Sequence, residues 1–436
     1  GIPNQKLSKI SFTKFADAMR LAHSFLFCCL FTLGYAQTYP YRETIAKLCS
    51  PEFAGRGYVD GGRILAANLI AVEVHKIGLK PFKKNFQQPF TLPVQTFPGA
   101  CTIAIGEDTL RPGLDYLVAP SSAGVMPQFF ELVYCNTATL YRSVNAFKPC
   151  PADRILVVQT SGFGGDTNKV LQARLQELQK FAATIEVTSN KLTWSVSQEA
   201  SPFPAFQVLA SALSNKPQSA FIHLDAFFNP KFTSSNVIGY LPAAQNAKKK
   251  PYLVITAHYD HLGKMGKDTY FPGANDNASG VGMLLFLAKE LSLQRNPDYN
   301  YVFMAFGGEE AGLVGSNYFV NHPLFKLSQI RFLLNTDIMG SGEEGITVVN
   351  ATLFKSEFDR LVEMNKDGNF LTQVKSRGPA ANSDHYFFTE KGVPAFFVYT
   401  MGPNKHYHDI HDKAEELSYA AFEPLAKLLL GFMRSF

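Results

Sequence analysis

Residues 252–261 read Tyr252-Leu253-Val254-Ile255-Thr256-Ala257-His258-Tyr259-Asp260-His261, an apolar run that ends in a polar cluster. The apolar part does not alternate with polar residues, which is the pattern of a strand buried on both faces of a sheet. Further strand-like runs, and helices with one apolar face, occur along the rest of the chain. The runs are 301–306, 331–335 and 395–400, and the helices are expected over 280–291 and 422–433. This alternation predicts an α/β fold in which helices sandwich a mixed, largely parallel sheet.

Polar side chains are concentrated where the expected strands end. The carboxyl ends of parallel strands meet at one edge of a sheet, so side chains in these loops converge although they are far apart in sequence. The residues concerned carry imidazole, carboxylate or phenol groups: His258, Asp260, Asp276, Glu309, Glu310, Asp337, Tyr407 and His408. The sequence therefore predicts one shared site at this edge of the sheet.

The chemistry of this group favours a metal centre. Imidazole and carboxylate groups without thiolates suit Zn²⁺ or a similar divalent ion, and two histidines with three carboxylates can hold two ions if one carboxylate bridges them. The adjacent Glu309 and Glu310 can divide the work, because one can bind metal while the other transfers a proton. In His258-x-Asp260 the carboxylate is spaced to orient a ligand imidazole. Two nearby histidines, His261 and His385, are not needed as ligands.

In the same order along the chain, these motifs resemble those of the bacterial leucyl aminopeptidase and glutamate carboxypeptidase family of co-catalytic zinc exopeptidases. The resemblance runs from His258 to His408 and includes Ser383-Asp384-His385. It implies the zinc-peptidase fold and two Zn²⁺ ions per chain. The positions that correspond to the family's metal ligands are His258 and Asp337 for one ion, Glu310 and His408 for the other, and Asp276 as the bridge.

The same resemblance implies roles for the remaining residues of the group. Glu309 would be the general acid/base, and Asp260 would orient His258. Tyr407, directly before the last ligand histidine, would polarise the substrate carbonyl. The family also places a cis peptide bond after the bridging aspartate, which here is the Asp276–Asn277 bond.

Composition and the N-terminus limit the possible functions. The chain has 436 residues, 46% hydrophobic and 18% charged, and its net charge of +5 gives no reason to expect binding to nucleic acid. Residues 19–36 begin with Met and Arg, continue as a short apolar run and end in small residues, which is typical of a signal peptide. That run is too short to span a bilayer. A secreted or periplasmic protein without stable membrane insertion is predicted.

The rest of the chain divides by pattern into a catalytic domain and an insert. Residues 37–93 and 233–436 are assigned to the catalytic domain, which includes an amphipathic helix expected over 61–77. Residues 94–232 carry short β-like runs between Pro, Gly, Ser and Asn clusters and are predicted to form a small β-rich domain. This region resembles the protease-associated domain that several branches of the family insert.

The function predicted from these residues is that of an exported zinc-dependent metallopeptidase. An aminopeptidase acting on peptides with neutral N-terminal residues, whose side chain enters an apolar pocket, is the leading interpretation. A carboxypeptidase of the same family, a glutaminyl-peptide cyclotransferase with a single zinc ion, and a binding ectodomain of the transferrin-receptor kind are the alternatives. The oligomeric state is not predicted.

Overall fold

The computed structural model describes residues 38–213 and 216–436. The signal peptide expected over 19–36 lies outside these residues, and it stays a prediction together with the location it implies. Among the described helices, none combines the length and the apolar character needed to cross a lipid bilayer.

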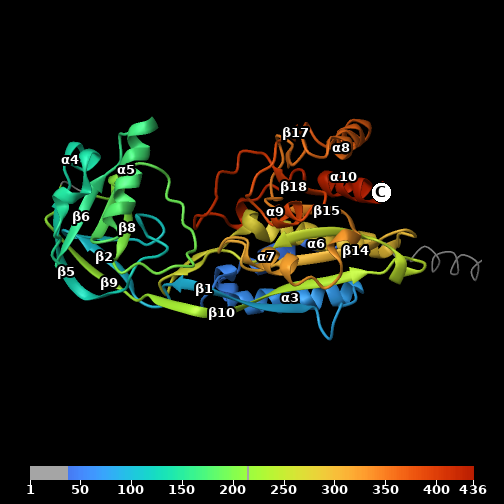
Figure 1. The fold of residues 1–436 in the computed structure, drawn as a ribbon, viewed down its shortest axis with the longest axis horizontal. Coiled ribbons are helices and arrows are strands. Elements are labelled where there is room, and N and C mark those ends of the chain that lie inside the picture. The colour runs from blue at the N-terminus through green and yellow to red at the C-terminus, as the bar shows by residue number, and fades with distance from the viewer. Residues whose placement is uncertain (1–37, 214–215) are drawn as a thin grey trace, which may run out of the picture. The chain divides into compact units, whose positions relative to one another are not determined.

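An eight-stranded mixed sheet forms the centre of the catalytic domain (Figure 1). Its strands β14, β11, β15 and β18 run parallel, and the pairings β1–β10, β10–β14 and β16–β18 are antiparallel. In spatial order the strands are β1 (Gln87–Thr96), β10 (Phe227–Leu241), β14 (Asn300–Phe306), β11 (Tyr252–His258), β15 (Ile330–Thr336), β18 (Ala395–Thr400), β16 (Ile346–Val349) and β17 (Val374–Ser376). The parallel strands are those predicted from the apolar runs.

Helices pack on both faces of this sheet, which explains why β11 and β14 are apolar along their length. One face contacts α3 (Gly62–Ile77) and α6 (Ser279–Leu293), and the other contacts α7 (Val314–Asn321) and α9 (His385–Glu390). The helix α10 (Phe422–Arg434) packs against α6, and its Phe432 ring contacts Phe332 of β15 and Phe396 of β18. The helices α2 (Tyr41–Leu48) and α8 (Lys355–Gly368) pack against α6 and α10, respectively. The predicted α/β sandwich is confirmed.

A second eight-stranded sheet is built from the region between β1 and β10. It carries two helices, α4 (Thr137–Arg142) and α5 (Gly165–Leu178). Its strands, in spatial order, are β3 (Asp108–Leu110), β2 (Cys101–Ile105), β9 (Ser219–Leu224), β5 (Val125–Tyr134), β6 (Arg154–Gln159), β7 (Ala183–Thr188), β8 (Ala205–Leu209) and β4 (Tyr116–Val118). A two-stranded ribbon, β12 (Gly263–Met265) with β13 (Thr269–Phe271), adds Met265 and Phe271 to the same apolar core. The assignment of this region as a protease-associated domain stays a prediction.

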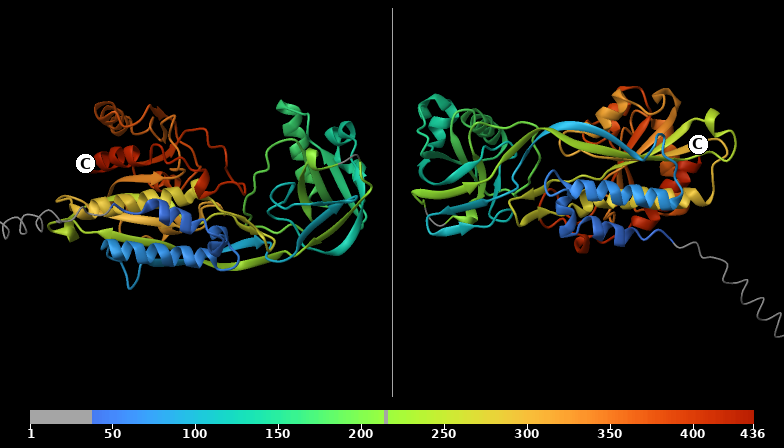
Figure 2. Two further views of the ribbon diagram at one scale, coloured as in Figure 1. Left: turned by 180° about the vertical axis from the view of Figure 1, so that it is seen from behind. Right: turned by 90° about the horizontal axis from the view of Figure 1, so that it is seen from below.

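The predicted boundaries of the insert fall inside two long strands. Strands β1 and β10 lie side by side and pair from Gln87–Val237 to Thr96–Phe227, so residues 93/94 and 232/233 lie within a continuous ladder (Figure 2). The register shifts between Leu92 and Val94, where Pro93 has no N–H to donate. The chain therefore enters and leaves the insert through paired backbone.

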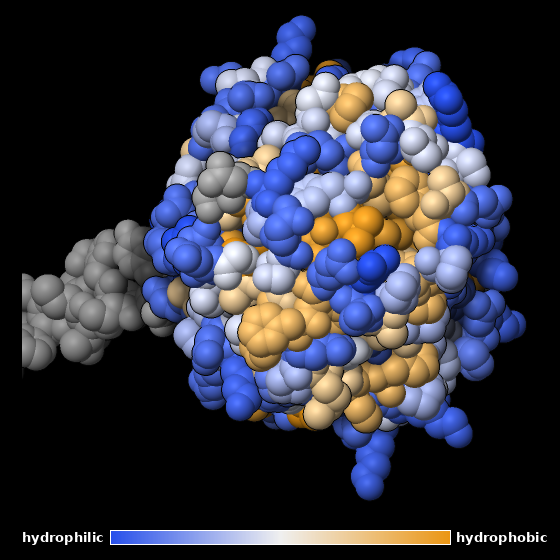
Figure 3. Space-filling model, turned by 90° about the vertical axis from the view of Figure 1, so that its left-hand side faces the viewer, coloured by the Kyte–Doolittle hydropathy of each residue, from blue (hydrophilic) through white to orange (hydrophobic). Residues whose placement is uncertain are grey.

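Two apolar side chains on β5 of the second sheet face solvent. Met126 and Phe129 on β5 are 78% and 72% exposed, and the rings of Phe129 and Phe221 lie 5.2 Å apart between centroids. Apolar side chains are gathered on the corresponding face of the molecule (Figure 3).

Candidate metal and catalytic site

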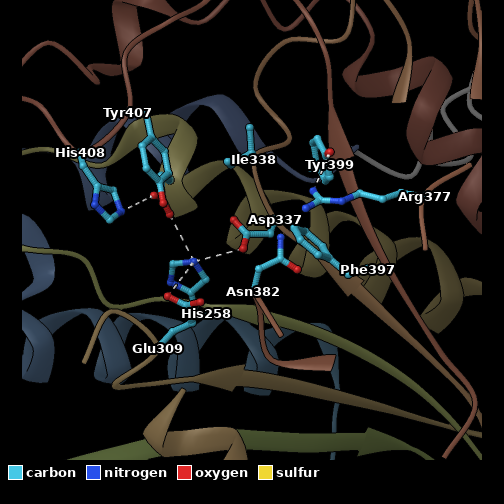
Figure 4. Close-up of a pocket in the computed structure, with 11 residues that line it drawn as sticks. His258, Glu309, Asp337, Ile338, Arg377, Asn382, Phe397, Tyr399, Tyr407 and His408 are labelled. Atoms are coloured by element: carbon cyan, nitrogen blue, oxygen red, sulfur yellow. Dashed lines mark hydrogen bonds and ion pairs between the residues drawn. The ribbon is translucent and has the colours of Figure 1, made fainter. Parts of the chain in front are cut away.

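The parallel strands deliver the predicted residues to one edge of the central sheet. Strand β11 lies between β14 and β15, and its last residue, His258, is level with Phe306 at the end of β14. Asp337 directly follows β15, and Glu309 lies three residues beyond β14. These side chains surround a common space at the strand ends (Figure 4).

Asp276 reaches this edge from the segment that precedes α6. The start of α6 lies close to the end of β15: a Cβ on Gly280 would lie 2.6 Å from the main-chain oxygen of Thr336, so only glycine fits there. The side-chain oxygen of Asn277 accepts hydrogen bonds from the main-chain N–H groups of Gly280 and Ile338, which ties the two segments together. The Asp276–Asn277 peptide bond is cis, as the resemblance implied.

Asp276 has one carboxylate oxygen facing each of two histidines. Its Oδ1 lies 3.3 Å from Nε2 of His258, which is also 3.5 Å from Oδ2 of Asp337. Its Oδ2 lies 3.1 Å from Nε2 of His408, which is also 3.1 Å from Oε2 of Glu310. The structure thus brings all five predicted ligand residues together in two groups. One group contains His258 and Asp337, the other contains His408 and Glu310, and Asp276 belongs to both.

The donor set of this centre fits divalent cations. His258, Asp276 and Asp337 each offer a ligand atom within 4.8 Å of the others. Oδ1 of Asp337 is buried and has no hydrogen-bond partner among the described residues. Carboxylates crowded together away from water are costly unless a positive charge neutralises them, and nitrogen and oxygen donors without sulfur suit Zn²⁺.

The pKa values of the adjacent glutamates are shifted in opposite directions. Burial raises the pKa of Glu309 well above its ordinary value, and the carboxylates of Glu310 and Asp384 add to this effect. Burial acts in the same direction on Glu310, but the imidazoles of His408 and His261 outweigh it and lower the pKa of Glu310 to about 2. A pair of carboxyl groups whose pKa values are driven apart is the pattern expected for one ligand and one proton carrier.

Asp260 differs from the prediction in the group that it contacts. Its carboxylate lies 3.9 Å from Nδ1 of His258, too far for a hydrogen bond, whereas its main-chain oxygen is 3.2 Å from the same nitrogen. The carboxylate instead accepts hydrogen bonds from the N–H groups of Glu309 and Glu310, at 3.1 and 3.3 Å, and from the hydroxyl of Tyr58 at 2.8 Å. The side chain of Asp260 therefore fixes the glutamates, and its backbone orients His258.

Two contacts to the acidic ligands were not predicted. The carboxylate of Asp412 accepts hydrogen bonds from the N–H groups of Asn275 and Asp276, at 2.8 and 3.0 Å. The hydroxyl of Ser383 donates to Oδ2 of Asp337 at 2.9 Å. Ser383 lies in a motif noted in the sequence, and Asp412 lies four residues after His408, but the partners of both are set by tertiary packing.

The two histidines expected to lie outside the ligand set are both buried. Nδ1 of His261 lies 2.7 Å from Oε1 of Glu310, and His261 forms a further group of closely spaced donors with Asp276 and Glu310. His385 is 1% exposed, and burial lowers its pKa to about 4, so it is neutral near pH 7. His261 is therefore placed to position Glu310, a partner that was not predicted for it.

A segment of the insert holds the loop that carries His408. Nδ1 of His408 lies 2.7 Å from the main-chain oxygen of Trp194, and the N–H of Trp194 donates to the main-chain oxygen of His408 at 2.9 Å. The ammonium of Lys191 lies 2.6 Å from both the main-chain oxygen of Lys405 and Oδ2 of Asp409. Because the Nδ1–H of His408 is donated to Trp194, Nε2 is the ring nitrogen that would bind a metal ion shared with Asp276 and Glu310.

Tyr407 lies at the mouth of this site. Its ring stacks on that of His408 with centroids 4.0 Å apart, and the residue is 46% exposed. Partial burial and the nearby carboxylates, Asp276 first among them, raise the pKa of Tyr407, so its hydroxyl keeps its proton.

A cavity of about 300 Å³ opens beside the strand ends. Its lining joins the charged centre to an aromatic and polar wall. The residues are His258, Asp276, Glu309, Asp337, Ile338, Arg377, Asn382, Phe397, Tyr399, Tyr407 and His408. Substrate bound in this cavity would contact the metal-binding groups directly.

Residues 236–433 match the sequence profile of peptidase family M28. Over 217 residues the chain is 31% identical to aminopeptidase YwaD of Bacillus subtilis (strain 168), an alignment that covers 46% of this chain and 44% of that protein. A probable leucine aminopeptidase of Arthroderma otae is 27% identical over 221 residues, covering 47% of this chain and 58% of the relative. The chain thus spans about half the length of the curated relatives it matches. The expected family resemblance is confirmed for residues 236–433.

Solved structures of the same fold cover more of the chain. The zinc aminopeptidase BSAP of Bacillus subtilis superposes with a TM-score of 0.68 at 21% identity, covering 91% of this chain and 94% of that one. An aminopeptidase of Aneurinibacillus sp. strain AM-1 gives a TM-score of 0.61 at 21% identity, covering 90% and 92% of the two chains. These similarities show a shared fold that includes the region of the second sheet.

Proposed function

We propose that this protein is a metal-dependent aminopeptidase that uses two divalent cations, zinc by preference, to hydrolyse the first peptide bond of its substrate. The observation that carries the proposal is the placement of Asp276, whose two oxygens face His258 and His408 separately. A residue placed in this way is suited to bridge two ions. The relatives described above are an aminopeptidase and a probable leucine aminopeptidase, which supports action at the amino end.

The proposed metal ligands follow the two groups described above. His258 and Asp337 would hold one ion, Glu310 and His408 the other, and Asp276 both. When bound, such a pair of cations polarises a peptide carbonyl and makes an attacking water more acidic.

Glu309 is proposed as the group that moves the proton. Its carboxylate lines the cavity, with Oε2 3.9 Å from Nε2 of His258, and the N–H of Glu309 is fixed by Asp260. It would accept a proton from the attacking water and return it to the nitrogen of the leaving peptide. Tyr407, which keeps its proton and lines the cavity, would donate a hydrogen bond to the substrate carbonyl oxygen.

The test uses the purified chain with leucine p-nitroanilide, an N-acetylated peptide and a peptide that begins with glutamine. We expect release of p-nitroaniline that is lost with a chelator and restored by Zn²⁺, with no cleavage of the N-acetylated peptide. Cleavage of the blocked peptide from its carboxyl end would replace the proposal with a carboxypeptidase. Pyroglutamate formation with one ion per chain would replace it with a cyclotransferase.

A further inference from the structure

The wall of the cavity opposite the metal-binding groups carries a guanidinium group. Arg377 follows directly after β17, and its side chain lies beside Tyr399 and Phe397 in the cavity lining (Figure 4). Nη1 of Arg377 donates a hydrogen bond to the hydroxyl of Tyr399 at 3.1 Å. No cation was predicted here from the sequence, and the pocket was expected to be apolar.

The guanidinium of Arg377 lies over the ring of Tyr399, with Cζ 6.0 Å from the ring centroid, and it is not paired with a carboxylate of the described chain. No described Asp or Glu forms an ion pair with Arg377, although Glu309, Asp276 and Asp337 line the same cavity. Its side-chain hydrogen bond goes to the neutral hydroxyl of Tyr399, which leaves the other N–H groups of the guanidinium available.

The neighbours of Arg377 complete a site for an extended acidic group. Phe397 and Ile338 offer apolar surface for methylene groups, and the amide of Asn382 adds a polar edge. A planar guanidinium at the end of an apolar wall matches a carboxylate, which it can bind through two parallel hydrogen bonds. A neutral aliphatic side chain could not use these donors, which stay solvated by water because Arg377 is exposed.

We infer that Arg377 recognises a carboxylate of the substrate, so that the enzyme prefers an acidic N-terminal residue over a neutral one. The inference rests on the proposed function, because it assigns the substrate class of the same site. The carboxylate could also be the free C-terminus of a short peptide, whose chemistry is the same. The experiment therefore separates the two sources.

The first arm compares the p-nitroanilides of glutamate, glutamine and leucine, which carry no free C-terminal carboxylate. We expect the wild type to have a higher kcat/KM for glutamate than for glutamine. Arg377→Met should lower the glutamate-to-glutamine ratio at least about tenfold, since a charge-assisted hydrogen bond is lost. Arg377→Glu should shift the preference toward lysine p-nitroanilide.

The second arm compares the dipeptide Leu-Ala with its C-terminal amide in the same variants. A loss confined to the free dipeptide would identify the C-terminal carboxylate as the group recognised. Lys375→Met removes a positive charge from the same strand, where Lys375 is exposed and does not line the cavity, and it should leave both ratios unchanged.

Two kinds of failure are distinguishable. If leucine p-nitroanilide is hydrolysed but Arg377→Met changes neither ratio, the inference is overturned and the proposed function stands. If no substrate of either arm is turned over by zinc-loaded protein, the proposed function fails and the inference fails with it.

Discussion

His258 and His408 face opposite oxygens of Asp276, yet they are held in different ways. His258 ends a buried strand, is 1% exposed, and has its Nδ1 next to the main-chain oxygen of Asp260, two residues along the chain. His408 lies in a loop with a positive φ of 53°, has a side chain 12% exposed, and contacts Trp194 in the insert. The central sheet therefore fixes the half of the proposed metal centre that contains His258. The half that contains His408 depends on a contact with Trp194, which is far away in the sequence.

The largest expected effect tests the roles proposed for the adjacent glutamates, in which Glu309 transfers the proton and Glu310 binds one ion. Glu309→Gln should lower kcat by about 10²- to 10⁴-fold while metal content is kept, because an amide cannot accept the proton. Glu310→Gln, the matched variant, should lose affinity for one ion. Metal analysis and steady-state kinetics on both variants check this, and metal loss in Glu309→Gln alone would mean that the two roles are reversed.

A second prediction compares the two histidines by stability. In chelator-treated protein, His258→Ala should lower the free energy of unfolding by about 3–5 kcal/mol, because it leaves buried carboxylates without a counter-charge. His408→Ala should cost less, since water can reach its partly exposed loop. Urea unfolding of the two variants provides the measurement. If His408→Ala lowered the free energy of unfolding as much as His258→Ala or more, the proposed difference between the two histidines would be contradicted.

The parallel strands and the clustering of polar side chains at their ends could be predicted from sequence for a physical reason. Strands such as β11 and β14 are continuous apolar runs, and the rule that parallel strands end at one edge then places His258 near Asp337 without knowledge of side-chain packing. The roles given to these residues remain proposals that the predictions here test.

The contacts that could not be predicted are those made by backbone or by tertiary packing. A main-chain oxygen such as that of Trp194 has no signature in a sequence, and its 2.7 Å approach to His408 depends on how the insert folds. Asp260 was predicted to orient His258, and its main-chain oxygen does lie beside that ring. Its carboxylate is instead directed at the N–H groups of Glu309 and Glu310. The charge on the cavity wall at Arg377 was missed because β17 is short and has no apolar run to mark it.

A smaller effect should follow from loosening the insert contact. Lys191→Met keeps most of the side chain but removes the ammonium that binds Asp409 and the 405–407 backbone. We expect the affinity of the ion held by Glu310 and His408 to fall about tenfold, with the other ion unaffected. Competition with a zinc chelator measures both affinities. Lys169→Met, on the exposed surface of α5, is the matched control and should change neither. An equal change in both variants would show that the insert does not position His408.

The number of zinc ions bound per chain, determined by equilibrium dialysis and elemental analysis, tests the central claim most directly. The wild type should bind two ions, and Asp276→Asn should weaken both, because each ion loses its share of one bridging carboxylate. Asp298→Asn, which removes a surface carboxylate paired with Lys250, should still bind two. A single ion in the wild type, or loss of only one ion in Asp276→Asn, would contradict a pair of cations bridged by Asp276.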